Sequence, residues 1–181
     1  ARYVIEAIVQ TGPEKGALQT AYLAELLHLS SDQPTSLYAM NVKTAEERLL
    51  ASPLISAAQV RRLPPATLYI DYTARQPLAR LSDFENVALD RAGFQFPIHP
   101  FFTPKTLPEI YLGLASFGGW QAPLQGAPFA LALSLLEQFS SPPWREFIRV
   151  ERIDVSHAFA KNLGQREIVL FLEEEIEGEG G

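Results

Sequence analysis

Residues 55–73, ISAAQVRRLPPATLYIDYT, decide the fold of the first half of the chain. Their second half alternates apolar and more polar positions, which is the period of a strand with one buried face. The apolar members of this alternation are Leu68, Ile70 and Tyr72. Pro64 and Pro65 cannot donate hydrogen bonds to a strand ladder, so they mark a turn. We therefore predict a hairpin of two strands, residues 55–62 and 67–73.

The residues before this hairpin predict one strand and two helices. An apolar and polar alternation over residues 3–9 indicates a strand that stops at Gly12. Apolar residues recur at helical spacing over residues 17–27, and Asn41 is a suitable N-cap for a second helix over residues 42–51. The order is strand, helix, helix, strand, strand, which predicts a two-layer α+β unit over residues 1–73.

The rest of the chain predicts a β-rich domain over residues 74–173 with one or more helices. Residues 75–77 are the expected junction, and residues 174–181 are an expected acidic, glycine-rich tail. Short strands are expected at 78–81, 87–89, 94–96 and 109–112, and residues 128–139 have the apolar density of one buried helix. A last hairpin pairs residues 147–155 with residues 166–172.

Composition excludes several classes of protein. The chain has 181 residues, a formal charge of -6 and no cysteine. Five glutamates lie in the last nine positions, so the body is close to neutral and offers no basic face for nucleic acid. The absence of cysteine excludes disulfides, a thiolate nucleophile and cysteine-ligated zinc. The apolar stretches are too short to span a bilayer, so any membrane anchor would lie upstream.

No set of residues predicts catalysis, a cofactor or a metal site. Asp154, Ser156 and His157 are close in sequence, but on a strand residue 157 would point away from the other two. His28 is expected to close the C-terminal turn of its helix, and His99 to pack in a proline-rich loop. Three scattered histidines make a poor metal site, and no phosphate-loop or dinucleotide motif occurs. We predict a protein that is not an enzyme.

Aromatic and basic residues leave alternatives open. Five aromatic residues in the loops could cover one end of the β-rich core, or they could line a cleft for a ligand or partner. They are Phe96, Phe101, Phe102, Phe117 and Trp120. Arg61 and Arg62 adjoin the proline turn, where they could contact an acidic partner or form an ordinary solvated strand end.

Several of these features together resemble the FtsQ/DivIB family of bacterial cell-division proteins. The resemblance is carried by Ser52-Pro53-Leu54-Ile55, by residues 58–62 with Pro64, by residues 67–70, by Pro77-Leu78-Ala79, and by Asp90, Gly93 and Phe96. It covers residues 8–96 well and the remainder by pattern. The sequence departs from the family at residues 74–77, where an acidic residue often precedes the arginine-proline-like step, and this affects any inference about charge at the domain joint.

The resemblance implies a POTRA domain followed by a β domain, both outside the cytoplasmic membrane. It also implies a single membrane helix upstream and a scaffolding role in the divisome at the septum. The implied partners are FtsB/DivIC- and FtsL-type proteins, and the oligomeric state stays open. In the family pattern a further helix and strand would follow the last hairpin, so we expect the tail to be a solvated linker to a missing element.

If the last hairpin strand is an edge, its free backbone groups could accept a partner strand. The candidate partner-binding residues are Arg166, Glu167, Ile168, Val169, Leu170, Phe171 and Leu172, together with Arg61 and Arg62. The alternative function is a POTRA-bearing component of an outer-membrane protein secretion or assembly system. It is less favoured because the strand–helix–helix–hairpin order appears once in the sequence.

Overall fold

A computed structural model describes residues 3–103 and 106–175 of the chain, which divides into two compact units, Ala1–Arg75 and Gln76–Gly181. The division lies two residues after the boundary expected from sequence. The fold is α+β with few helices, as the sequence predicted.

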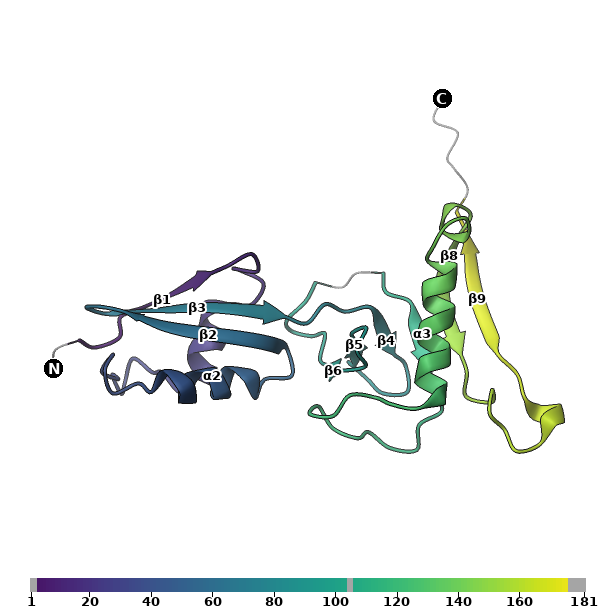
Figure 1. Ribbon diagram of the computed structural model, residues 1–181, viewed down its shortest axis with the longest axis horizontal. Helices are drawn as coiled ribbons and strands as arrows, with labels where there is room; N and C mark the ends of the chain where they lie inside the picture. The colour runs from purple at the N-terminus through teal and green to yellow at the C-terminus, as the bar shows by residue number, and fades with distance from the viewer. Residues whose placement is uncertain (1–2, 104–105, 176–181) are drawn as a thin grey trace, which may run out of the picture. The chain divides into compact units, whose positions relative to one another are not determined.

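The first unit is a three-stranded sheet with two helices. Its elements are β1 (Ala7–Thr11), α1 (Thr20–Leu26), α2 (Val42–Leu50), β2 (Ile55–Leu63) and β3 (Thr67–Ala74). The order is β1-β3-β2, with β3 parallel to β1 and antiparallel to β2 (Figure 1). The predicted hairpin is confirmed, and the alternation in β3 buries Leu68, Ile70 and Tyr72. These side chains share the core with Leu23 of α1 and Leu49 of α2, which are both 0 % exposed.

Local signals set the ends of both helices. The side chain of Asn41 accepts a hydrogen bond from Thr44 N at 3.0 Å, which confirms the predicted N-cap. His28 has a positive φ of 58°, and its N–H donates to Glu25 O. Leu29 N donates to Ala24 O, which completes a Schellman motif, so His28 does close the helix, through its backbone.

Two predicted boundaries near the start of the chain are wrong. Residues 3–5 do not pair with β3, because Ile5 N donates to Thr35 O and Leu37 N donates to Tyr3 O. The strand therefore begins at Ala7 and runs to Thr11. The helix predicted from residue 17 begins at Thr20, because Leu18 N donates to the Tyr72 hydroxyl at 2.8 Å and is held outside the helical ladder.

The second unit is a six-stranded sheet with one long helix. Its strands are β4 (Ala79–Leu81), β5 (Ala88–Leu89), β6 (Gln95–Phe96), β7 (Glu109–Tyr111), β8 (Ile148–Asp154) and β9 (Val169–Glu174), in the order β6-β5-β4-β7-β8-β9. Helix α3 (Ala127–Phe139) packs against β8 (Figure 1). Its Phe129, Ala132 and Leu136 are buried in one cluster with Val150 and Ile153.

The aromatic loop residues mostly cover this core. Phe117 makes edge-on contacts with Phe84 and Trp120, at ring centroid distances of 5.4 and 4.8 Å. Phe84 and Trp120 in turn pack against the buried cluster. Phe96 is fully buried and its ring contacts Phe102 at 5.9 Å. Of the two alternatives left open by the sequence, these contacts support the core-covering role.

Candidate partner-binding site

Strand β9 lies at the end of the six-strand order and pairs with β8 on one side. The strand starts three residues later than predicted and continues two residues further, to Glu174. Arg166, Glu167 and Ile168 are therefore in the loop before it. Pairing stops at Asp154 and Val169, because the Asp154 carboxylate accepts a hydrogen bond from Ser156 N and turns the chain away from the ladder.

The two faces of β9 differ. Leu170 lies opposite Ile153 and packs against the buried cluster, and Leu172 lies opposite Val150 on the same face but is 40 % exposed. Phe171 lies opposite Arg152 on the other face and is 49 % exposed. The edge strand thus presents accessible apolar side chains on both faces, next to a backbone edge that no other described strand pairs with.

Charged side chains surround Phe171 on its face of the sheet. Arg152 pairs with Glu109 at 3.4 Å and lies 5.3 Å from the centroid of the Tyr111 ring. Arg149 forms an ion pair with Glu173. A hollow of about 380 Å³ lies beside these groups, lined in part by Leu107, Glu109, Arg152 and Phe171. Since these ion pairs are largely exposed, they orient the side chains more than they stabilise the fold.

The predicted arrangement of Asp154, Ser156 and His157 is wrong. Strand β8 ends at Asp154, and the chain turns after it. The turn places Ser156 Oγ 2.6 Å from Asp154 Oδ1 and 3.1 Å from His157 Nδ1. The hydroxyl donates to Asp154, so serine lies between the acid and the imidazole. In a catalytic triad the histidine holds that place and takes the serine proton, so this arrangement does not activate a nucleophile.

The pKa of Asp154 reflects these contacts. Partial burial raises this pKa, but hydrogen bonds from the Ser156 hydroxyl and backbone N–H outweigh it, and the charges of Arg152 and His157 act in the same direction as these bonds. The net effect holds the pKa of Asp154 below its ordinary value. The Asp154 carboxylate therefore stabilises the turn after β8 by accepting hydrogen bonds from Ser156.

The loop residues expected to bind a partner have local partners of their own. Arg166 Nε donates to Ala160 O at 2.8 Å, and Glu167 lies 3.9 Å from His157 Nδ1. Ile168 is 46 % exposed and lies near the start of β9. Sequence reasoning missed further exposed apolar side chains in this unit, because single apolar residues in loops carry no periodic signal. They are Trp144, Phe147, Phe159 and Leu163.

Arg61 and Arg62 take different roles in the hairpin of the first unit. The Arg61 guanidinium lies 6.0 Å from the centroid of the Tyr69 ring and is exposed. Arg62 donates to the backbone carbonyls of Leu37 and Met40 and fixes the loop before α2. Both residues are exposed, and the guanidinium of Arg62 is held by two backbone carbonyls, so Arg61 is the less constrained of the two.

Within residues 3–103 and 106–175, no cluster of three or more histidine or acidic side chains has the arrangement of a metal site. No helix in the described part of the chain is both long and apolar enough to cross a bilayer.

The comparison with protein families identifies the first unit. The family model "POTRA domain, FtsQ-type" matches residues 16–72, which hold both helices and all of β2. The first unit is an FtsQ-type POTRA domain. This match confirms the predicted resemblance and supports a protein of the FtsQ/DivIB family. No curated protein matches the chain. The POTRA domain also suggests a division-related scaffold role with contacts to other proteins.

Proposed function

We propose that this chain is a non-enzymatic scaffold of the bacterial divisome, which docks other division proteins outside the cytoplasmic membrane. The FtsQ-type POTRA domain is the observation that carries the proposal. In this proposal the chain is held at the periplasmic face of the inner membrane by a helix upstream of residue 1. The matched domain is of the FtsQ type, so a role in outer-membrane secretion is less supported.

The proposed mechanism at the β domain is strand addition to β9. Backbone hydrogen bonds to the unpaired edge would supply affinity, and alternate side chains would supply selectivity. Leu172 and Phe171 are the accessible contacts, one on each face of the strand. The proposed partners are FtsB/DivIC- and FtsL-type proteins, whose apolar residues would cover Leu172 on the α3 side and Phe171 on the other.

Substitutions in β9 test this mechanism. Phe171→Asp and Leu172→Asp place a charge where a partner strand would pack, at positions already 49 % and 40 % exposed. We expect each variant to weaken capture of a purified FtsB/DivIC- and FtsL-type complex by at least about tenfold, or roughly 1.4 kcal/mol.

The matched control is Leu50→Asp, which makes the same kind of change at a 43 % exposed position on α2 of the POTRA domain. It should leave capture by β9 unchanged. Circular dichroism and dispersed amide spectra establish that each variant folds. Undiminished capture by folded β9 variants would overturn strand addition at this edge.

A further inference from the structure

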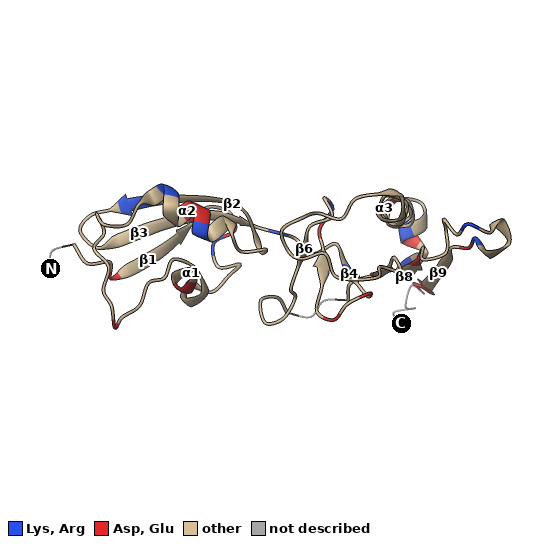
Figure 2. Cartoon of the chain, turned by 90° about the horizontal axis from the view of Figure 1, so that it is seen from below, with Lys and Arg blue, Asp and Glu red and all other residues tan. Residues whose placement is uncertain are grey.

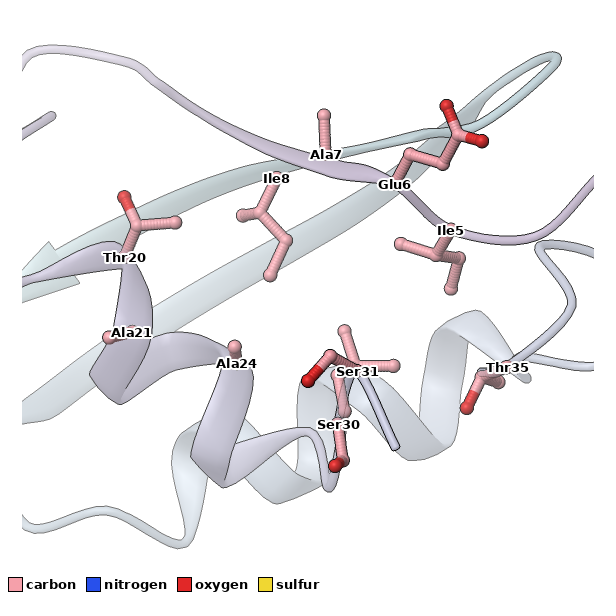
Figure 3. A pocket seen from close by; sticks show the side chains of 11 residues that line it. Ile5, Glu6, Ala7, Ile8, Thr20, Ala21, Ala24, Ser30, Ser31 and Thr35 are labelled. Atoms are coloured by element: carbon pink, nitrogen blue, oxygen red, sulfur yellow. The ribbon is translucent and has the colours of Figure 1, made fainter. Parts of the chain in front are cut away.

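A groove runs along the outer edge of β1 in the POTRA domain. One wall is formed by residues 5–8, and the other by Thr20, Ala21 and Ala24 at the start of α1. Ser30, Ser31 and Thr35 lie at the opposite end (Figure 3). The volume of the groove is about 320 Å³, which is at the lower end of the range for ligand sites.

The chain itself already covers one end of this edge. Val4 and Ser36 form an antiparallel bridge, and Ile5 N donates to Thr35 O at 2.9 Å. The loop before α2 therefore acts as a short strand outside residues 3–5. Further along, the side chain of Gln10 donates to Leu18 O and Thr20 Oγ1, at 2.8 and 3.0 Å, and closes the other end. Residues 6–9 lie between these closures, and β1 pairs only with β3 in the described structure.

The opposite edge of the POTRA sheet is closed by a side chain of its own. On β2, the backbone N–H of Val60 donates to Glu46 Oε1 of α2 at 3.0 Å. A carboxylate on an outward N–H occupies a position that an incoming strand would need. Of the two edges of this sheet, β1 is therefore the better template for a partner strand.

The side chains along the groove specify what an added strand would meet. Ile5 and Ile8 point into the groove toward α1, where Ala24 leaves space, whereas Glu6 and Ala7 point away from the helix (Figure 3). Successive side chains of a strand point to opposite faces. Glu6, which precedes β1, and Ala7 break this alternation, since both of their N–H groups donate to Ala66 O. A strand added beside residues 6–9 would place small apolar side chains against Ile8 and its other side chains on the face of Glu6 and Ala7 (Figure 3).

The charge around the groove is negative. Glu6 is the charged residue among those that line the groove, and residues 3–36 also carry Glu14, Glu25 and Asp32 against a single lysine. Among the basic residues of α2 and β2 (Figure 2), Arg48 reaches the end of α1, where its guanidinium donates to Leu27 O at 3.2 Å. Among the described residues, Glu6, Glu25 and Asp32 form no ion pair. A basic partner would gain electrostatic attraction here, and nucleic acid or anionic lipid would be repelled.

We propose that the β1 edge of the POTRA domain binds a short extended segment of a partner protein in which basic and small apolar residues alternate. The segment pairs as an added strand with residues 6–9, with its apolar residues in the groove and its basic residues beside Glu6. This surface is separate from β9, so the proposal does not depend on the one made for the β domain.

A peptide titration of the ¹⁵N-labelled chain tests this proposal. The probe is an acetylated and amidated peptide of sequence KVKTKV, and the comparison peptide EVETEV keeps its alternation with opposite charge. We expect KVKTKV to shift the amide signals of residues 6–11 and 20–24. Salt near 1 M, where the Debye length is about 3 Å, should weaken its binding, and EVETEV should not bind.

Two substitutions locate the site. Glu6→Lys should raise the dissociation constant of KVKTKV about fivefold or more, since a reversed rim charge replaces attraction with repulsion. Glu47→Lys on α2 makes the same charge change away from the groove and should alter binding less than twofold. Ala24→Leu fills the groove and should remove the shifts.

Amide dispersion shows whether each variant is folded. If Ala24→Leu does not fold, the dissociation constants of KVKTKV for Glu6→Lys and Glu47→Lys still test whether the peptide binds at this groove. Absence of KVKTKV binding, shifts confined to β2, or equal effects of the two lysine substitutions would each overturn the proposal.

Discussion

The carboxylate of Glu46 on α2 accepts a hydrogen bond from the backbone N–H of Val60 on β2, at 3.0 Å. The contact joins a helix to a strand edge 14 residues away in sequence. It satisfies a part-buried backbone donor and occupies part of the edge that would otherwise invite pairing.

Replacing Glu46 by alanine should therefore have two effects. The unpaired N–H should lower the free energy of unfolding of the POTRA domain by about 1 kcal/mol. The exposed edge should also raise self-association, measured by sedimentation velocity at increasing concentration. Glu46→Gln keeps the accepting oxygen and should behave like the parent in both measurements. If the alanine variant and the parent behave alike, the contact neither stabilises the domain nor blocks pairing at the β2 edge.

Tyr72 is the centre of a buried polar cluster, and removing its hydroxyl should destabilise the domain. The hydroxyl accepts from Leu18 N and donates to Gln10 Oε1, each at 2.8 Å. Tyr72→Phe leaves the buried Leu18 N without its acceptor, whereas Gln10 Oε1 still accepts from Gly16 N at 2.7 Å. The substitution should cost about 1–3 kcal/mol in urea unfolding followed through the amides of β3. Tyr69→Phe, on the open face of the same strand, is the matched control and should cost less than about 0.5 kcal/mol.

The same residue predicts a loss of stability at alkaline pH. Burial raises the pKa of Tyr72 above its ordinary value of 10.0; the hydrogen bond from Leu18 N opposes this shift, and the charge of Glu14 adds to it. The unfolded chain then releases this proton at a lower pH than the folded chain does. The contribution of Tyr72 to the free energy of unfolding should be fully present below pH 10.0. It should be lost as the pH rises through the folded pKa. Tyr72→Phe should remove this part of the pH dependence, and an unchanged profile would contradict it.

Ser156→Ala should raise the pKa of Asp154, because it removes the side-chain hydrogen bond that opposes the effect of burial. Carbon-detected NMR titration of the carboxyl measures the shift directly. In the parent, the favourable contribution of this depressed pKa is present above 3.8 and is lost as the pH falls through the folded value. His157→Gln removes only a weaker influence, so its effect on the pKa should be smaller than that of Ser156→Ala.

Gly12→Ala should destabilise the POTRA domain. Gly12 has a φ of +85°, and an added Cβ would lie 2.3 Å from Asp71 Oδ1. Gly16 has the same φ of +85° with no atom within 4 Å of the added Cβ, so Gly16→Ala isolates the cost of the backbone conformation. We expect about 1 kcal/mol for Gly16→Ala and more for Gly12→Ala. Adding Asp71→Ala to Gly12→Ala should recover the difference, and thermal unfolding measures all three.

Local patterns in the sequence predicted the hairpin and the second helix well. The alternation ending in Tyr72 and the proline turn fixed β2 and β3, and Asn41 fixed the start of α2. Both signals depend only on residues that are close together in the sequence. The start of β1 was predicted wrongly, because residues 3–5 pair with a loop about thirty residues later.

The candidate site was predicted less completely. The position of β9 at a sheet edge and its two apolar contacts follow from a hairpin pattern, although three of the residues expected in the strand lie in a loop. The contact between Ser156 and His157 depends on where β8 ends, which alternation alone does not define. The groove on β1 is formed by residues from three separate segments, so it has no signature in the linear sequence.

The parallel pairing of β1 with β3 has a mechanical consequence for the POTRA domain. The chain enters at the start of β1 and leaves at the end of β3, so its two ends lie at opposite ends of one ladder of hydrogen bonds. The exit is fastened by Glu14, which accepts from Ala74 N, and by Arg75 N, which donates to Leu54 O. Tension between the two ends would load this ladder in shear, with all of its bonds sharing the force, instead of unzipping them one after another.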